Sequence, residues 1–183
     1  MVKTIIKSHP KEKRKARDDG SSVLYIAESF CDTIQGENFV GYPSTFLRLQ
    51  FCTLNCVWCD TAEVWRDGNP YSIKELIELW DKEGIMDKLR LGQHLVLTGG
   101  SPIRQQDALY ELLVMIQEKY KFRPFTEIEN ECTLMPKERF IMFIDRWNNS
   151  PKIENSGMKK DLRFKPHILI RLNKIKDSWF KFV

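Results

Sequence analysis

The sequence contains no apolar run of the roughly 20 residues that a membrane-spanning helix needs. It also lacks an apolar signal-peptide core, because residues 1–19 become charged almost at once. These absences predict a cytoplasmic protein outside the membrane, with reduced thiols. No internal repeat is present, and no low-complexity tract lies beyond the first 20 residues, which argues against repeat architectures.

Outside the first 20 residues of this 183-residue chain, acidic and basic residues balance, so neither sign of charge is in excess. Those 20 residues carry seven Lys or Arg against three acids, which accounts for the whole net charge of +4. We therefore expect residues 1–22 to form a basic, flexible N-terminal arm and residues 23–183 to form one domain. A nucleic-acid contact by this arm is possible, but a solvated tail is the favoured interpretation, since the body has no basic bias.

Cysteine is also scarce, and its odd count of five argues against a disulfide framework. Three of the five, Cys52, Cys56 and Cys59, form a C-x3-C-x2-C pattern with no fourth cysteine nearby. A four-iron cluster normally takes four protein ligands, so three thiolates would leave one iron open to bind another ligand. The alternative is a zinc site that borrows a distant fourth ligand from Cys31, Cys132 or His94.

Short apolar runs alternate with amphipathic helical patterns from residue 23 onward. Residues rich in β-branched and aromatic side chains predict strands over 23–30, 44–51, 94–100 and 125–129. Spacing of apolar residues predicts helices over 72–84, 105–120 and 136–147. Ser72 and Glu75 form a capping box, and Gly84 is a plausible stop for the first of these helices. The alternation predicts an α/β fold around a mostly parallel sheet.

The strand that leads into the cysteine loop carries polar residues on one face. Strict alternation would place Phe46, Arg48, Gln50 and Cys52 together, opposite an apolar face. A guanidinium directed into an enclosed sheet face predicts an anionic ligand, because an unpaired buried charge would be costly. An Arg at a solvated sheet edge is the alternative.

The cysteine loop, followed by a strand that ends in TGG (98–100), resembles the radical S-adenosylmethionine (SAM) superfamily. Further motifs narrow the resemblance to the 7-carboxy-7-deazaguanine synthase (QueE-like) family of carbon–nitrogen lyases: TIQGE (33–37), G-x-P-S-x-F-x-R-L (41–49), CVWCDT (56–61), LTGGSP (97–102), IENECT (128–133) and NSPKIENSG (149–157). The resemblance runs from about residue 24 to the end. It implies an incomplete, compressed (β/α) barrel of the radical SAM type.

The resemblance also implies the reaction. A radical derived from SAM would start the ring contraction of 6-carboxy-5,6,7,8-tetrahydropterin to 7-carboxy-7-deazaguanine, with loss of ammonia, in the biosynthesis of queuosine-type 7-deazapurines. The implied cofactors are a [4Fe–4S] cluster, SAM and Mg²⁺. The implied partners are an electron donor such as flavodoxin and a second copy of the chain in a homodimer.

The family's functional positions map onto individual residues of this sequence, and the resemblance implies no side chain that acts as a catalytic acid or base, because the radical comes from SAM. Cys52, Cys56 and Cys59 would hold the cluster, and Thr61 would bind Mg²⁺. The implied SAM-binding residues are Trp58, Gly99, Gly100, Glu129 and Ser150. The implied substrate-binding residues are Gln35, Glu37, Arg48 and Thr98.

The sequence departs from the family pattern at several points. Ser101 stands where the family commonly has a Glu after the two glycines, and Asn38 replaces a glycine in TIQGEG. Cys132 occupies the glycine position of the family's IETNGT, so we expect a different backbone geometry there. The family's chains usually continue past a strand like WFKFV (179–183), so we expect this chain to be cut inside a domain.

Two other functions stay open at this stage. One is an activating enzyme for a glycyl-radical protein, which would carry the same cysteine spacing but act on a protein backbone. The other is a non-catalytic relative that binds a cluster or zinc. The TIQGE and CDT motifs speak against the first, and Ser101 together with the expected truncation keeps the second open.

Overall fold

The computed structural model describes residues 1–8, 13–37 and 39–182. The strands are β1 Lys3–Lys7, β2 Val23–Ile34, β3 Pro43–Leu49, β4 Asn69–Ser72, β5 His94–Gly99, β6 Thr126–Asn130, β7 Arg146–Asn149 and β8 Ser178–Phe180. The α-helices are α1 Ala62–Arg66, α2 Ile73–Lys82, α3 Ile85–Arg90, α4 Gln106–Tyr120, α5 Glu138–Ile141, α6 Lys160–Arg163 and α7 Pro166–Asn173. Short 3-10 helices cover Pro102–Gln105 and Glu154–Ser156.

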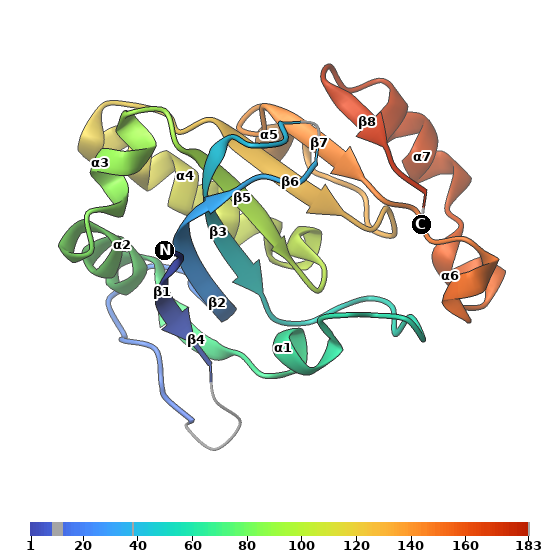
Figure 1. Ribbon diagram of the computed structural model, residues 1–183, viewed down its shortest axis with the longest axis horizontal. Coiled ribbons are helices and arrows are strands. Elements are labelled where there is room, and N and C mark those ends of the chain that lie inside the picture. Colours follow the sequence, from blue (N-terminus) through green and yellow to red (C-terminus); the bar gives the residue numbers. More distant parts are fainter. Residues whose placement is uncertain (9–12, 38, 183) are drawn as a thin grey trace.

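The described strands form one mixed sheet in the order β1-β2-β3-β5-β6-β7-β8, with β4 paired to β2. The neighbours from β3 through β8 run parallel, while β1, β2 and β4 pair in antiparallel fashion. Within the described part of the chain, the sheet is not closed into a barrel (Figure 1). This confirms the predicted α/β class and the incomplete barrel.

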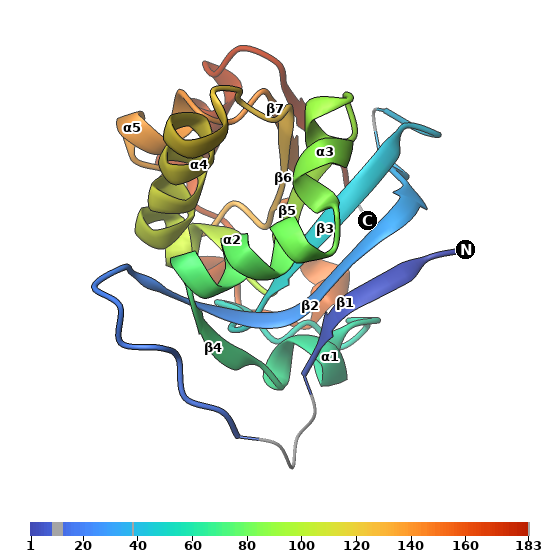
Figure 2. The ribbon, with the colours of Figure 1, turned by 90° about the vertical axis from the view of Figure 1, so that its left-hand side faces the viewer.

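Helices cover one face of the sheet and bury its apolar side chains (Figures 1 and 2). The predicted capping box of α2 is present, with the Ser72 hydroxyl accepting from the Glu75 amide at 3.1 Å and the Glu75 carboxylate accepting from the Ser72 amide at 2.9 Å. The predicted apolar stripes of α2 and α4 are buried: Ile73, Leu76, Ile77, Trp80, Leu109, Leu112, Leu113 and Ile116. Apolar spacing was therefore sufficient to predict both helices.

Two predicted elements differ from the structure. The helix expected over 136–147 is wrong for most of its length, because only Glu138–Ile141 is α-helical and Arg146–Asn149 is strand β7. Pairing with β6 and β8 on either side decides this, and it places Trp147 in the core. The strand expected over 44–51 ends at Leu49, because Phe51 adopts a φ of +73°. Alternation therefore fails at Gln50, whose side chain donates to the Arg66 carbonyl at 2.8 Å.

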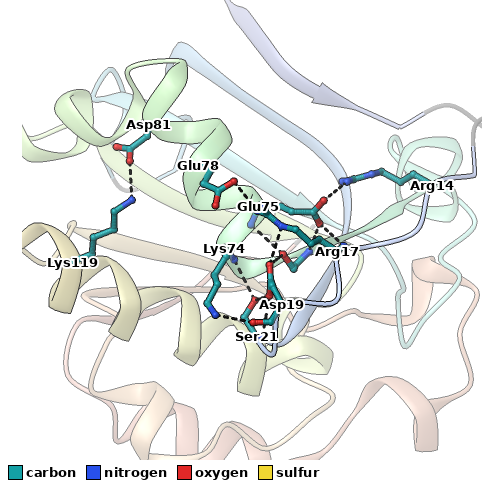
Figure 3. Close-up of polar contacts among 10 residues, drawn as sticks. Arg14, Arg17, Asp19, Ser21, Lys74, Glu75, Glu78, Asp81 and Lys119 are labelled. Carbon is teal, nitrogen blue, oxygen red and sulfur yellow. Dashed lines mark hydrogen bonds and ion pairs between the residues drawn. The ribbon is translucent and has the colours of Figure 1, made fainter.

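The described part of the basic N-terminal segment packs on the body, which differs from the expected free arm. Strand β1 pairs with β2, so residues 3–7 belong to the sheet. Arg14 and Arg17 form ion pairs of 2.7 Å with Glu75 and Glu78 on α2 (Figure 3). Residues 9–12 of the expected arm lie outside the described residues, as do Asn38 and Val183.

None of the helices formed by the described residues is long and apolar enough to cross a bilayer.

The parallel arrangement of the strands has a consequence for function. The carboxyl ends of β3, β5, β6 and β7 meet at one edge of the sheet, where loops that carry ligand-binding residues gather in α/β proteins. The cysteine loop follows β3 at this edge (Figure 1).

Candidate cluster and cofactor site

A cavity of about 480 Å³ lies at the carboxyl edge of the parallel strands. Its size is within the range of small-molecule sites, which is about 300–1,000 Å³. It brings together residues from Glu37 to Lys181, which lie 144 positions apart in the sequence. The site residues predicted from sequence that line it are Glu37, Arg48, Cys52, Cys56, Trp58, Cys59, Thr61, Thr98, Gly99, Gly100, Glu129 and Ser150.

The three cysteines of the loop after β3 are free thiols that line this cavity. The loop is tightened by the Cys59 amide, which donates to the Cys56 carbonyl at 3.2 Å. Two donors orient the sulfur atoms. The Leu54 amide donates to Sγ of Cys52 at 3.4 Å, and the indole N–H of Trp65 donates to Sγ of Cys59 at 3.3 Å.

Burial raises the pKa of the Cys52 thiol to about 11, and it also raises the pKa of the Cys56 thiol. Thiolates are the form that binds iron, so loading a cluster here must displace protons. Among the described residues, no three His, Cys, Asp or Glu side chains converge closely enough to hold a single metal ion. Three thiols around a wider cavity suit an iron–sulfur cube, which takes one thiolate at each of three corners.

The residues that would complete a zinc site lie elsewhere. Sγ of Cys31 contacts Nζ of Lys88 at 3.4 Å, and Nδ1 of His94 contacts the Glu127 carboxylate at 2.7 Å. Cys132 is fully buried, and its amide donates to the Asn130 side chain at 3.1 Å. The described residues thus offer no support for a distant fourth zinc ligand.

Gly99 and Gly100 lie where β5 passes close to the start of the cysteine loop. A Cβ atom on Gly99 would meet the Leu49 carbonyl oxygen at 2.3 Å, and one on Gly100 would meet the Phe51 carbonyl oxygen at 2.3 Å. Gly99 also has a φ of +118°, which favours glycine. Both glycines therefore pack directly against the backbone that leads into the cysteine loop. Both also line the cavity.

Charged and polar side chains form the wall beside the cluster loop. Thr98 donates to Oε2 of Glu129 at 2.5 Å across the β5–β6 edge. Burial raises the pKa of the Glu129 carboxyl, while the Thr98 hydrogen bond acts in the opposite direction. Glu37 forms an ion pair with Lys181, which lies 144 positions away in the sequence.

The remaining predicted positions are held by local contacts. Ser150 accepts a hydrogen bond from Nζ of Lys152 at 2.9 Å, and that ammonium lies 5.2 Å from the centre of the Trp58 ring. Thr61 is the N-cap residue of α1, and its hydroxyl is 3.8 Å from Sγ of Cys59. Thr61 thus faces the cavity close to Cys59.

Gln35 is the predicted substrate residue that the cavity lining does not include. It is buried, and its Nε2 donates to the Glu127 carboxylate at 3.1 Å. Its Oε1 accepts from the amides of Gly36 at 2.7 Å and Glu37 at 3.3 Å. Gln35 therefore orders the loop that carries Glu37 into the cavity.

The structure adds lining residues that sequence reasoning missed: Leu54, Trp65, Asn130, Glu131, Asn148, Lys152 and Lys181. Lys152 and Glu131 lie inside the NSPK and IENECT motifs, so those motifs could have identified them. Lys181 carries no local signal, because only the β7–β8 pairing brings it to the site. Cys132 adopts a φ of +67°, so it keeps the left-handed conformation that favours glycine, contrary to the expected change of geometry.

Comparisons with known proteins agree with this geometry. The family model described as "4Fe-4S single cluster domain" matches residues 35–132. Curated relatives named 7-carboxy-7-deazaguanine synthase include that of Buchnera aphidicola, 30% identical over 84% of this chain and 71% of the relative. The relatives from Bacillus cereus and Rickettsia prowazekii are 33% and 35% identical over 78% and 77% of this chain. The chain spans 58% and 57% of those two relatives.

A solved structure described as "Crystal structure of QueE from Escherichia coli" has the same fold. It superimposes with a TM-score of 0.56 at 20% sequence identity. The match covers 87% of this chain and 82% of that chain.

Proposed function

This chain belongs to the 7-carboxy-7-deazaguanine synthase family, and from that premise we propose that it converts 6-carboxy-5,6,7,8-tetrahydropterin to 7-carboxy-7-deazaguanine. Loss of ammonia accounts for the whole change in composition, so the reaction consumes no external oxidant. When bound, the cluster and SAM supply the one-electron chemistry that starts the ring contraction. One observation carries the proposal: the cysteine loop, the two glycines after β5 and the Arg48 side chain all line the same cavity.

The chain's own residues would hold and orient these groups. Cys52, Cys56 and Cys59 would bind three irons of the cluster and leave the fourth open to SAM. The backbone at Gly99 and Gly100 and the side chains of Trp58, Glu129 and Ser150 would surround SAM, as the family pattern implies.

The substrate would lie beside SAM in the same cavity. Arg48 would bind the pterin carboxylate, since a guanidinium matches the geometry of a carboxylate. Glu37, ordered by Gln35 and paired with Lys181, and the hydroxyl of Thr98 would bind polar groups of the pterin ring. Thr61 would contribute one oxygen to an Mg²⁺ ion that substrate oxygens also bind.

Three further parts of the proposal rest on family resemblance. A flavodoxin-type electron donor would reduce the cluster, a second copy of the chain would form a homodimer, and the enzyme would work in the cytoplasm. Because the chain spans 71% or less of the relatives named above, the activity of this chain is part of what has to be tested.

The test starts with anaerobic reconstitution with iron and sulfide, followed by metal analysis. We expect about four irons and four sulfides per chain. Cys56→Ala should lose most of the iron, whereas Cys31→Ala, outside the cavity, should retain it. One zinc per chain and no iron would instead favour a structural metal site.

The activity assay then adds SAM, dithionite, Mg²⁺ and 6-carboxytetrahydropterin, with mass spectrometry as the readout. Formation of 7-carboxy-7-deazaguanine is the expected result. A loaded cluster that cleaves SAM but yields no deazaguanine would contradict the proposed substrate, and a protein-backbone substrate would be tested next.

A further inference from the structure

A buried carboxylate lies near the amino ends of β5 and β6, away from the edge that carries the cysteine loop. It belongs to Glu127, the second residue of β6, which is fully buried. Its Oε1 lies 2.7 Å from Nδ1 of His94, the first residue of β5. Its Oε2 accepts from Nε2 of Gln35 and from Nδ2 of Asn148, both at 3.1 Å. These three partners provide the hydrogen bonds that a buried carboxylate needs.

The carboxamide of Gln35 fits its surroundings in one orientation only. A carboxylate accepts hydrogen bonds and a backbone amide donates them, so Nε2 must face Glu127 and Oε1 must face the loop backbone. Oε1 accepts from the amides of Gly36 at 2.7 Å and Glu37 at 3.3 Å. Gln35 is 1% exposed and is not among the residues that line the cavity. Its carboxamide therefore joins the buried carboxylate to the loop and presents almost no surface to a bound pterin.

His94 holds the same loop at a second point. Its ring stacks between those of Tyr42 and Phe125, with centroids 4.7 and 4.3 Å away and an angle of 27° in each case. Tyr42 lies in the loop that Gln35 begins, and its carbonyl accepts from the Gln35 amide at 2.8 Å. The His94–Glu127 pair thus contacts the loop at both of its ends.

We propose that Gln35 is a positioning residue in this chain and not a ligand of the substrate. The Glu127–His94 pair fixes, through Gln35, the position from which Glu37 meets the pterin. This inference rests on the proposed function. Glu37 lines the cavity and its own amide donates to Gln35, so a displaced Gln35 side chain releases Glu37 as well. A loop that is already ordered costs less free energy to bind the substrate, which favours affinity.

The test exchanges the two side chains. Gln35→Glu places a second carboxylate against Glu127, and the repulsion should displace the loop. The KM for 6-carboxytetrahydropterin should rise by about 10- to 100-fold, with kcat nearly unchanged. Gln35→Glu combined with Glu127→Gln again sets one amide against one carboxylate and should recover most of the KM. Gln117→Glu, at an exposed position on α4, is the matched control and should keep the wild-type KM.

Hydrogen–deuterium exchange provides a readout that needs no substrate. The amides of Gly36 and Glu37 should exchange faster in Gln35→Glu and slow down again in the double variant. Iron content and the Kd for S-adenosylhomocysteine should stay at wild-type values in both, which a general loss of structure would not allow. Restored protection without a restored KM would show that the substrate needs the Gln35 amide itself, and this result overturns the inference.

A further variant decides the case in which the double variant restores no protection. Glu127→Met keeps Gln35 and removes its acceptor. A direct ligand would still bind the pterin, whereas a positioning residue would lose its support. A raised KM with unchanged iron content supports the inference, and a wild-type KM overturns it.

The failures of the two proposals differ. A wild type that forms 7-carboxy-7-deazaguanine with the same KM as Glu127→Met overturns the positioning role and leaves the proposed function standing. A wild type with a full cluster that forms no 7-carboxy-7-deazaguanine overturns both.

Discussion

Nε of Arg48 donates to Oε2 of Glu28 at 3.2 Å, between residues that face each other across the antiparallel β2–β3 pair. The same guanidinium lines the cavity. A guanidinium has five N–H donors in a fixed plane, so Glu28 fixes its orientation through one of them. Arg48 thus faces the cavity, and the structure adds the Glu28 carboxylate that pairs with it.

Replacing Arg48 by Lys should weaken substrate binding, because an ammonium keeps the charge but loses the planar pair of donors. We expect the KM for 6-carboxytetrahydropterin to rise by about 10- to 100-fold, with the Kd for S-adenosylhomocysteine unchanged. Glu28→Gln serves as the matched control and should raise KM less, since the guanidinium remains. A variant that loses cofactor affinity but keeps the KM would assign Arg48 to the cofactor instead.

Replacing Gly99 by Ala should destabilise the fold, since the new Cβ would lie 2.3 Å from the Leu49 carbonyl oxygen at a φ of +118°. We expect a loss of about 2–3 kcal/mol in the free energy of unfolding, measured by chemical denaturation. Gly36→Ala is the control, because a Cβ there meets nothing within 4 Å. Equal stability of the two variants would show that the β5 end can move away from β3.

The stability of the protein should depend on Asp19 at acidic pH. Hydrogen bonds from the hydroxyls of Ser21 and Ser72 hold the pKa of the Asp19 carboxyl well below its usual range. The contacts around this carboxyl are shown in Figure 3. Because the folded-state pKa is lower than the unfolded one, the stabilisation is present above about pH 4 and is lost as the pH falls through the folded-state pKa.

The measurement is the difference in Tm between the wild type and Asp19→Asn from pH 7 down to pH 3. The variant should be less stable at pH 7, and the difference should shrink below about pH 4. Asp18→Asn, at the exposed neighbouring position, should show no such trend. A pH-independent difference would mean that Asp19 acts through shape alone.

Trp65 should raise the reduction potential of the bound cluster, because its indole N–H donates to Sγ of Cys59. Such hydrogen bonds stabilise the reduced, more negative state. A bond worth about 1 kcal/mol more to the reduced form corresponds to roughly 40 mV in a one-electron couple.

Trp65→Phe keeps the ring and removes the donor, so the potential should become more negative by tens of millivolts in a redox titration followed by electron paramagnetic resonance. Trp179→Phe, at an exposed position on β8, controls for a general effect of losing an indole. An unchanged potential in Trp65→Phe would show that the sulfur does not keep this hydrogen bond once iron is bound.

The sequence alone determined the features that depend on neighbouring residues. Three thiols within eight positions predict a shared metal site, because one short loop carries all of them. The same holds for the capping box of Ser72 and Glu75 and for the apolar stripes of α2 and α4, since caps and helical faces are set by residues three or four apart.

Only the tertiary structure decided features that depend on distant partners. Residues 146 and 147 belong to the predicted helix over 136–147 but begin strand β7, because hydrogen bonds to β6 and β8 outweigh local preference. Lys181 meets Glu37 across 144 positions, and Glu131 meets Ser101 from a different strand. The sequence therefore determined which chemistry the cysteine loop supports, while the packing of parallel strand ends decided which charges surround it.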